Sequence, residues 1–458
     1  MIRIFIPPNN IPEREYILDI VFNQFLKVPY KMIVSPNEIT ESYIFLSEST
    51  RYIIIKDAFF SCYPDPLSYL KDDAIPKNVT YSTSSIYIEK NIPILFGIDK
   101  IEIEEEFVIS HIDIFATIFF MLTRWEEYVI SHRDRHDRFQ AIDSLAFRFG
   151  FLDRPIVNEY IEFLWNMLIV LGYDERVRDN HKFSMMLTHD VDEVEAYPSF
   201  KKFSKQIAGD LLIRKKPLLA VERVCNYLKD ERDPYDTFDE IMDISDRYNL
   251  KSHFFFMSGG TTRYDNRYSI ESSVVKELIK KIKRRGHHIG FHPSYSAYRD
   301  FKQFSLEKDV LESASNLEID SGREHYLRFE VPTTWQIWED SGLSWCSNMA
   351  YADHSGFRTG VCYPFTPFNI LTRVQLNLKE IPLIVMEVTL MEESDSVEMF
   401  EEKIVYYFNI VKKYGGEFVF LWHNSNFKIY EDFNREKINL YSSVYEKVIN
   451  NYREIREC

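Results

Sequence analysis

The sequence predicts an α/β fold in which short apolar strands and amphipathic helices build a parallel sheet or barrel. From residue 183 onward the pattern alternates strand, helix and strand, which is typical of βα units. Three of the apolar segments end in Asp or His, as happens where parallel strands deliver side chains to one edge of a barrel. Residues 1–172 mix short strands with later helices, which predicts a smaller α+β domain before the barrel.

The boundary between these two parts is marked by a polar stretch. Segment 158–171 carries apolar residues on one helical face and stops at Gly172, as an amphipathic helix with a C-terminal glycine does. Residues 173–182 follow with no apolar period. We therefore expect an N-terminal α+β accessory domain over 1–172 and a (β/α) barrel over 183–458.

Six segments of the barrel region are short, apolar and strand-like. They are Ser184–Thr188, His253–Met257, His288–Phe291, Tyr326–Phe329, Pro382–Leu390 and Glu417–Trp422. Helical patterns lie between them, such as the one that contains Leu278 and Ile282 and closes at Gly286. Strands separated by helices of this length pair in parallel.

Composition and charge exclude several classes of partner. The 458 residues are 45% hydrophobic and carry a formal net charge of −16, which argues against a nucleic-acid partner. Five scattered cysteines without a CxxC pair argue against a thiolate zinc site and a disulfide framework. The longest apolar run, 112–122, is far below the ~20 residues that span a bilayer. We expect a cytoplasmic protein without stable membrane insertion, and the sequence leaves its oligomeric state open.

The segment 185–192 is an apolar run that ends in two carboxylates, Asp190 and Asp192. In an extended chain, residues two apart project to the same side. Two carboxylates held together repel, and the pair is tolerable if a cation binds one of them. One would then ligate a metal ion while the other accepts a proton from water. The alternative is a strand-end loop with solvated acids or a helix cap, and the histidine segments below favour the metal site.

Two histidines also stand at strand ends. His292 ends a strand and precedes Pro293, which takes the chain out of regular structure, so it is a candidate nitrogen ligand for zinc or a similar ion. His423 follows a strand apolar enough to be buried on both faces. An imidazole there suits a general acid near neutral pH. The alternative for either residue is a structural histidine at a strand terminus.

Two charged residues lie inside apolar segments. Arg328 sits in the predicted strand 326–329 and needs a partner, for which we expect Asp190, because the cation would keep a base ionised and oriented. Glu387 lies in a strand-like run and could support the site, ligate the metal or face outward. The chain lacks a GxSxG elbow, a phosphate-binding P-loop and a GxGxxG turn after a strand.

With these residues, the C-terminal half resembles the polysaccharide deacetylases of the NodB-homology type (carbohydrate esterase family 4). The resemblance covers about residues 183–450 and rests on Thr188–Asp192, Gly286–Pro293, the Arg328 segment with Pro332, and Leu421–His423. The whole chain looks like a bacterial subgroup with a long extra N-terminal domain, associated with making or modifying surface polysaccharide. Segments 122–128, 151–155 and 356–365 carry that likeness.

The resemblance implies a distorted (β/α) barrel, a divalent metal that is usually zinc, and hydrolysis of N-acetyl or O-acetyl groups on sugars. It also implies a role for each matching residue. These are the base for Asp190, the metal carboxylate for Asp192, the first metal histidine for His292, tuning of the base for Arg328, and the general acid for His423.

This sequence departs from the family pattern at one metal position. The family has a second metal histidine four residues after the first, and here that position is Ser296. A serine hydroxyl is a far weaker ligand than imidazole. The predicted metal site therefore contains Asp192, His292 and Ser296, and the serine hydroxyl, water or another side chain completes it.

The sequence thus predicts a metal-dependent hydrolase that removes N- or O-linked acetyl groups from a saccharide or surface-polysaccharide precursor. Water activated by the ion attacks the acetyl carbonyl, Asp190 accepts its proton, and His423 protonates the leaving amine or alcohol. An alternative is a catalytically degenerate saccharide-binding or assembly protein on the same barrel, with Ser296 marking the lost ligand. Amide hydrolysis on a non-sugar substrate is a third possibility.

Overall fold

The chain forms two compact units that are both assembled from separated segments. The computed structural model describes residues 1–35, 41–46, 50–82, 90–174, 176, 178–179, 181–228, 233–265, 267–427 and 435–457. Unit 1 comprises Met1–Ser184, Tyr326–Ile384 and Tyr407–Phe418, and unit 2 comprises Met185–His325, Val385–Tyr406 and Val419–Cys458. The sequence predicted two consecutive domains, whereas here the chain returns to unit 1 twice after residue 325.

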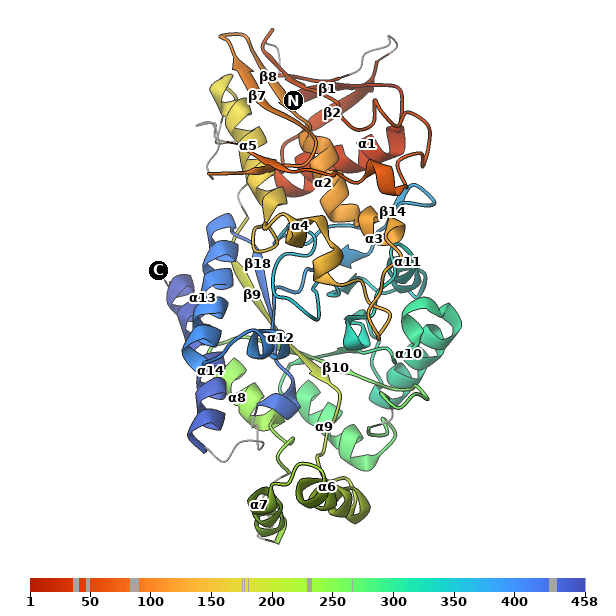
Figure 1. Cartoon of the computed structure of the whole chain (residues 1–458), viewed down its shortest axis with the longest axis vertical. Coiled ribbons are helices and arrows are strands. Elements are labelled where there is room, and N and C mark those ends of the chain that lie inside the picture. Colours follow the sequence, from red (N-terminus) through yellow and green to blue (C-terminus); the bar gives the residue numbers. More distant parts are fainter. Residues whose placement is uncertain are drawn as a thin grey trace. The chain divides into compact units, whose positions relative to one another are not determined.

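Unit 1 contains a mixed six-stranded sheet of order β2-β1-β3-β4-β8-β7 (Figure 1). Its strands are β1 (Ile2–Ile6), β2 (Tyr30–Val34), β3 (Ser42–Phe45), β4 (Tyr52–Ile55), β7 (Gly97–Ile103) and β8 (Phe107–Ile112). Only the pairs β1/β2 and β4/β8 are parallel among the pairings described. Helices α1 (Ile11–Leu18), α2 (Ile114–Thr123) and α5 (Ile156–Val170) pack beside it, and every residue of α2 is buried. The helix predicted over 158–171 is therefore confirmed as α5.

A buried ion network joins the separated segments of unit 1. The guanidinium of Arg358 donates from Nε and Nη2 to the two carboxylate oxygens of Glu127, at 2.9 and 2.5 Å. Arg124 donates to the same carboxylate at 2.8 Å and to Glu126 at 2.6 Å. Because these side chains are almost fully buried, removing one partner would leave an uncompensated charge in the core. This network fixes the segment after residue 325 to the N-terminal segment.

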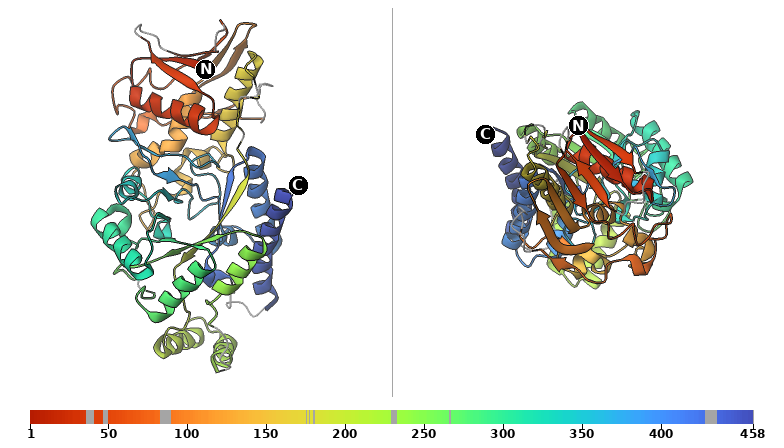
Figure 2. Two further views of the ribbon diagram at one scale, coloured as in Figure 1. Left: turned by 180° about the vertical axis from the view of Figure 1, so that it is seen from behind. Right: turned by 90° about the horizontal axis from the view of Figure 1, so that it is seen from above.

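In unit 2, six neighbouring strands of a curled parallel sheet have the order β12-β11-β10-β9-β18-β17 (Figure 2). The strands are β9 (Ser184–Val191), β10 (Ser252–Phe256), β11 (His288–Phe291), β12 (Ser321–Gly322), β17 (Val385–Met386) and β18 (Glu417–Leu421). Helix α8 (Phe238–Arg247) precedes β10, α9 (Ser273–Arg284) precedes β11, and α10 (Phe301–Ser315) precedes β12. Parallel strands connected by helices confirm the predicted α/β class with a barrel-like sheet.

Four of the six predicted strands are present, and the other two need correction. The segment Tyr326–Phe329 is not a strand: it lies at a 3-10 turn, His325–Leu327, where Tyr326 and Leu327 have φ of 61° and 51°. Positive φ excludes an extended strand. The segment Pro382–Leu390 is strand only at β17, because α12 (Glu387–Glu392) begins directly after it.

His189 ties three neighbouring strands together from the buried side of β9. Its Nδ1 lies 2.7 Å from the carbonyl oxygen of Trp422, which can only accept, so Nδ1 carries the hydrogen. Its Nε2 then accepts from the hydroxyl of Ser252, at 3.1 Å. Burial lowers the pKa of His189 to about 3, although the bond to Trp422 opposes this. His189 is therefore a neutral structural residue.

Gly322 allows β11 and β12 to approach closely just before the residues of the candidate site. It stands opposite Phe291 in the parallel pairing. A Cβ atom at this position would overlap the carbonyl oxygen of Phe291. Because Phe291 is followed by His292 and Gly322 by Arg323, the spacing between these two strands sets the distance between those side chains.

The remaining helices of unit 2 lie outside the sheet. Helices α6 (Phe200–Leu212) and α7 (Pro217–Leu228) form a hairpin between β9 and α8. Helices α13 (Val397–Tyr414) and α14 (Arg435–Glu457) come before and after β18. None of the helices that the structure describes combines the length and the apolar character needed to cross a membrane.

We expect His189→Gln to lower the free energy of unfolding by about 1–3 kcal/mol at pH 7, because buried hydrogen-bond partners lose good geometry. The folded-state pKa lies below the unfolded value of 6.5, so the stability that neutral His189 contributes is complete above pH 6.5 and is lost as the pH falls toward 3. The difference between the two proteins should therefore shrink below pH 6.5, by up to about 1.4 kcal/mol per pH unit. Urea unfolding at pH 7 and pH 5 measures it, and a constant difference would contradict this role.

Candidate metal centre

The polar residues of the site lie at, or directly after, the carboxyl ends of strands in the sheet of unit 2. They are Asp190 and Asp192 at the end of β9, His292 after β11, Arg323 and His325 after β12, Glu387 after β17, and His423 after β18. The carboxyl ends of parallel strands meet at the same edge of a sheet, which is where ligands bind in such folds. Side chains far apart in the sequence therefore arrive in one place.

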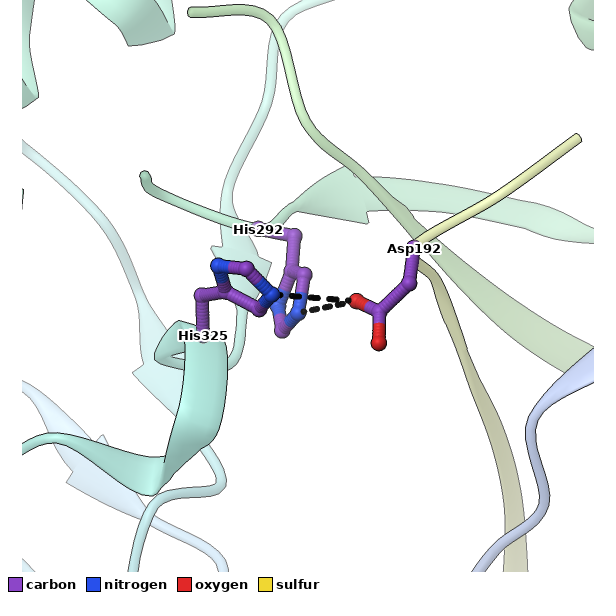
Figure 3. A group of neighbouring side chains, drawn as sticks. All are labelled: Asp192, His292 and His325. Carbon is purple, nitrogen blue, oxygen red and sulfur yellow. Dashed lines mark ion pairs between the residues drawn. The ribbon is translucent and has the colours of Figure 1, made fainter. Parts of the chain in front are cut away.

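Three of these residues form a group that could hold a metal ion. One ligand atom each from Asp192, His292 and His325 lies within 4.8 Å of the others (Figure 3). Oδ1 of Asp192 is 3.3 Å from Nε2 of His292 and 3.4 Å from Nε2 of His325. Two imidazole nitrogens and a carboxylate oxygen with space for water are the donor set of catalytic zinc sites.

The tautomer of His292 shows why this group fits a cation. Its Nδ1 lies 2.6 Å from the carbonyl oxygen of Arg323 and must donate to it. The lone pair of Nε2 then faces Oδ1 of Asp192, and two acceptors attract only if a proton or a cation lies between them. That buried oxygen of Asp192 has no hydrogen-bond donor among the described residues. A metal ion would satisfy both atoms, and we conclude that the residues present fit one.

His325 is oriented by a second carboxylate. Its Nδ1 lies 3.6 Å from Oδ1 of the buried Asp265. Burial raises the pKa of Asp265, but the neighbouring His325 and the hydrogen bonds from Tyr295 and Thr262 outweigh this and lower it to about 2. Asp265 therefore stays ionised, and its carboxylate faces Nδ1 of His325. A carboxylate behind a metal-binding imidazole fixes its tautomer and raises its basicity.

The structure points to a different third ligand from the one predicted. His325 offers the second imidazole nitrogen beside Asp192 and His292. Ser296 precedes a short 3-10 helix, Ala297–Arg299, and its hydroxyl is a weaker donor than an imidazole. The physical reason is the pairing of β11 with β12, which brings a residue after β12 beside His292. The family pattern, by contrast, has its second metal histidine only four residues after the first.

The arginine partner of Asp190 also differs from the prediction. Nη1 of Arg323 donates to Oδ1 of Asp190 at 2.8 Å and to the hydroxyl of Thr188 at 3.1 Å. Arg328 belongs to unit 1, where its Nε donates to the carbonyl oxygen of His136 at 2.7 Å. Because the strand predicted around Arg328 does not form, this residue is not carried on the sheet. Arg323 is therefore the cation that holds Asp190.

His423 and Glu387 form a second charged pair at this edge. Oε1 of Glu387, which is fully buried, accepts from Nδ1 of His423 at 2.7 Å and from its backbone N–H at 2.9 Å. Burial lowers the pKa of His423, but the charge and hydrogen bond of Glu387, with Asp192 and Asp190, outweigh it and raise the pKa to about 10. The imidazole is protonated at neutral pH, with Nδ1 engaged and the Nε2 hydrogen available. The sequence left three options for Glu387: supporting the site, ligating the metal or facing outward. The structure favours the first, because Glu387 accepts a hydrogen bond from Nδ1 of His423.

Arg323, His325 and Asp265 were not found from the sequence. Arg323 and His325 follow β12, which is only two residues long and contains no apolar side chain. The signal that could have found them is the pair of charged and imidazole side chains directly after Gly322. Asp265 lies in the long segment between β10 and α9, and nothing in its local pattern distinguishes it.

Comparison with known proteins bears on the two parts of the chain separately. Residues 2–172 match a family model described as a family of unknown function (DUF7033). No curated protein matches the chain.

Among solved structures, the chain is similar to three proteins related to polysaccharide deacetylases. A protein assigned as a polysaccharide deacetylase from Mycobacterium smegmatis shares 15% identity over 60% of this chain and 85% of that one, with a TM-score of 0.36. Another from Pseudomonas aeruginosa PAO1 shares 11% identity over 59% of this chain and 84% of that one, with a TM-score of 0.35. A CE4 family pseudoenzyme from Bacillus anthracis shares 10% identity over 60% of this chain and 63% of that one, with a TM-score of 0.30.

We expect His325→Ala to weaken zinc binding by more than about 100-fold, because loss of an outer hydrogen-bond partner alone typically costs about 10–100-fold. Ser296→Ala should leave the affinity within about threefold. Competition with a chromophoric chelator measures both values, and circular dichroism checks that each variant is folded. Equal affinities for the two variants, or a loss confined to Ser296→Ala, would contradict the ligand set.

Proposed function

We propose that this protein is a metal-dependent hydrolase that removes N- or O-linked acetyl groups from a saccharide or surface-polysaccharide precursor. The observation that carries the proposal is the pairing at one sheet edge. Asp190 with Arg323 provides a base, and His423 with Glu387 provides an acid. Both pairs belong to the unit that carries the candidate metal ligands. A separate base and acid beside a metal site are what hydrolysis of an acyl bond requires.

Each side chain has a defined role in this reaction. Asp190, oriented by Nη1 of Arg323, accepts a proton from the attacking water. His423 donates its Nε2 proton to the leaving nitrogen or oxygen, while Glu387 holds its Nδ1 hydrogen. When bound by Asp192, His292 and His325, a divalent ion, zinc by its donor set, supplies Lewis-acid activation of water and stabilisation of developing negative charge.

The substrate class rests on the sequence resemblance. The segments that match polysaccharide deacetylases include Thr188–Asp192 and Gly286–Pro293, which carry Asp190, Asp192 and His292. An acetylated saccharide is accordingly the proposed substrate, and a cytoplasmic location goes with the proposal. Metal-bound His292 must be neutral, and although burial lowers its pKa, Asp190 and Asp192 outweigh burial and raise it, so zinc affinity should fall as the pH is lowered.

The alternative of a degenerate saccharide-binding protein rested on Ser296. His325 weakens that argument, since it offers the imidazole that the serine position lacks. A site used for binding alone has no need for a positioned base and a positioned acid together. The hydrolase is therefore the better supported function.

We expect Asp190→Asn to reduce turnover by at least about 100-fold, because general-base catalysis contributes about 10²–10⁴-fold, while zinc stays bound. Acetate release from N-acetylated and O-acetylated oligosaccharides measures turnover, and elemental analysis measures zinc. Ser296→Ala is the matched control and should retain activity. Loss of zinc from Asp190→Asn would show that Asp190 is a ligand, and unchanged turnover would show that it is not the base.

We expect Glu387→Gln to move the alkaline limb of kcat/KM to lower pH by more than one unit. His423 acts in its protonated form, so activity is lost as the pH rises through its pKa, and removing the Glu387 charge lowers that pKa from about 10. The control is Glu392→Gln, an exposed residue of the same helix, which should leave the profile unchanged. An alkaline limb that does not move in Glu387→Gln would rule out the coupling.

A further inference from the structure

The α6–α7 hairpin carries a charge opposite to that of the rest of the chain. Residues 197–228 contain seven basic residues, namely Lys201, Lys202, Lys205, Arg214, Lys215, Lys216 and Arg223, and two acidic residues, Asp210 and Glu222. Their formal charge is 7 − 2 = +5, and since the whole chain carries −16, the remainder carries −16 − 5 = −21. The hairpin is thus a strongly basic element on an acidic protein.

The same hairpin carries the most exposed large apolar side chains of the described residues. Ile213, Leu212, Phe200 and Leu218 are 83%, 77%, 71% and 66% exposed. Three of the four belong to residues 211–218, the end of α6, the connecting turn and the start of α7, which we call the hairpin tip. The tip also contains the exposed basic residues Arg214, Lys215 and Lys216. Isolated exposed apolar residues are ordinary, but a cluster of this kind marks an interaction surface.

The two helices are already fixed against each other by contacts on their inner faces. The rings of Phe203 and Tyr227 stack with centroids 4.2 Å apart. Asp210 is fully buried, and its carboxylate accepts from Arg214 and from Arg223. Other side chains therefore already pack the interior of the hairpin, and the apolar residues of the tip are not needed there. Figures 1 and 2 show both helices beyond α8 and α9, at the end of unit 2 away from the sheet.

We propose that the hairpin tip docks peripherally on an anionic membrane surface. Leu212, Ile213 and Leu218 enter the interface between headgroups and acyl chains, and the neighbouring Lys and Arg side chains contact lipid phosphates. Apolar residues combined with basic ones are the features that bind interfacial helices to anionic lipid. The −21 charge of the remainder is repelled by such a surface, so the hairpin approaches first. The tip contains none of the candidate metal ligands, so this proposal does not depend on the proposed function.

The charge and the apolar residues together favour this occupant over others. A second copy of the chain that docks hairpin to hairpin would bring two surfaces of charge +5 into contact, which costs free energy. A nucleic acid would pair with the Lys and Arg residues, but phosphate contacts give no role to Ile213 and Leu218. An anionic bilayer uses both features of the tip.

The test is co-sedimentation of the full chain with vesicles of phosphatidylcholine containing 30% phosphatidylglycerol, beside vesicles of phosphatidylcholine alone. We expect binding to the anionic vesicles and weaker binding at 0.5 M NaCl. The double variant Lys215→Glu with Lys216→Glu should bind at least about tenfold more weakly, since each basic residue near the surface adds to the attraction by anionic lipid. Ile213→Ser with Leu218→Ser should also lose binding.

Two matched controls carry the same changes elsewhere on the surface. Lys412→Glu with Lys413→Glu reverses two exposed charges in unit 1, and Leu306→Ser removes a side chain that is 63% exposed. Both should bind vesicles as the unchanged protein does. No binding to anionic vesicles, or equal losses in the controls, overturns the proposal. So does a dimer in sedimentation velocity that Ile213→Ser with Leu218→Ser dissociates while vesicle binding is absent, because the tip would then join two copies.

Discussion

The parallel register of β9, β10, β11 and β12 is the constraint on which the candidate centre depends. Asp190 stands beside Phe255 of β10, Phe256 beside Phe291 of β11, and Phe291 beside Gly322 of β12. This register brings residues separated by more than a hundred positions to one sheet edge. Gly322 permits the close approach of β11 and β12. The buried His189 connects β9 to β10 through Ser252 and to the end of β18 through Trp422. The site is therefore a product of strand pairing rather than of one local motif.

The charges at this edge are arranged in pairs around the candidate ligands. Arg323 holds Asp190, Glu387 holds His423, and Asp265 lies behind His325. Each pair gives one buried group a partner of opposite charge and a defined orientation, which a buried charge requires. Oδ1 of Asp192 instead faces two imidazole nitrogens. That contrast supports the proposed assignment of Asp192 as metal ligand, Asp190 as base and His423 as acid.

The local sequence predicted most strands and several residues of the candidate site, but not the contacts between residues far apart in the chain. Apolar runs that end in Asp190, His292 and His423 identified the strands and three polar positions, because burial on both faces leaves a continuous apolar pattern. His325 was missed because β12 is two polar residues long and has no such pattern. Arg328 was chosen over Arg323 because apolar neighbours suggested a strand that positive φ excludes. The return of the chain to unit 1 depends on pairs such as Arg358 with Glu127, which spacing cannot predict.

The most direct test of this account is X-ray absorption at the zinc edge on the full chain loaded with one equivalent of zinc. The account predicts a first shell with two imidazole nitrogens at about 2.0–2.1 Å and oxygen ligands for the rest. In this account the two imidazoles are those of His292 and His325, and Asp192 supplies one of the oxygen ligands. Zinc that fails to bind, or a shell with one imidazole or none, would contradict the assignment of the centre.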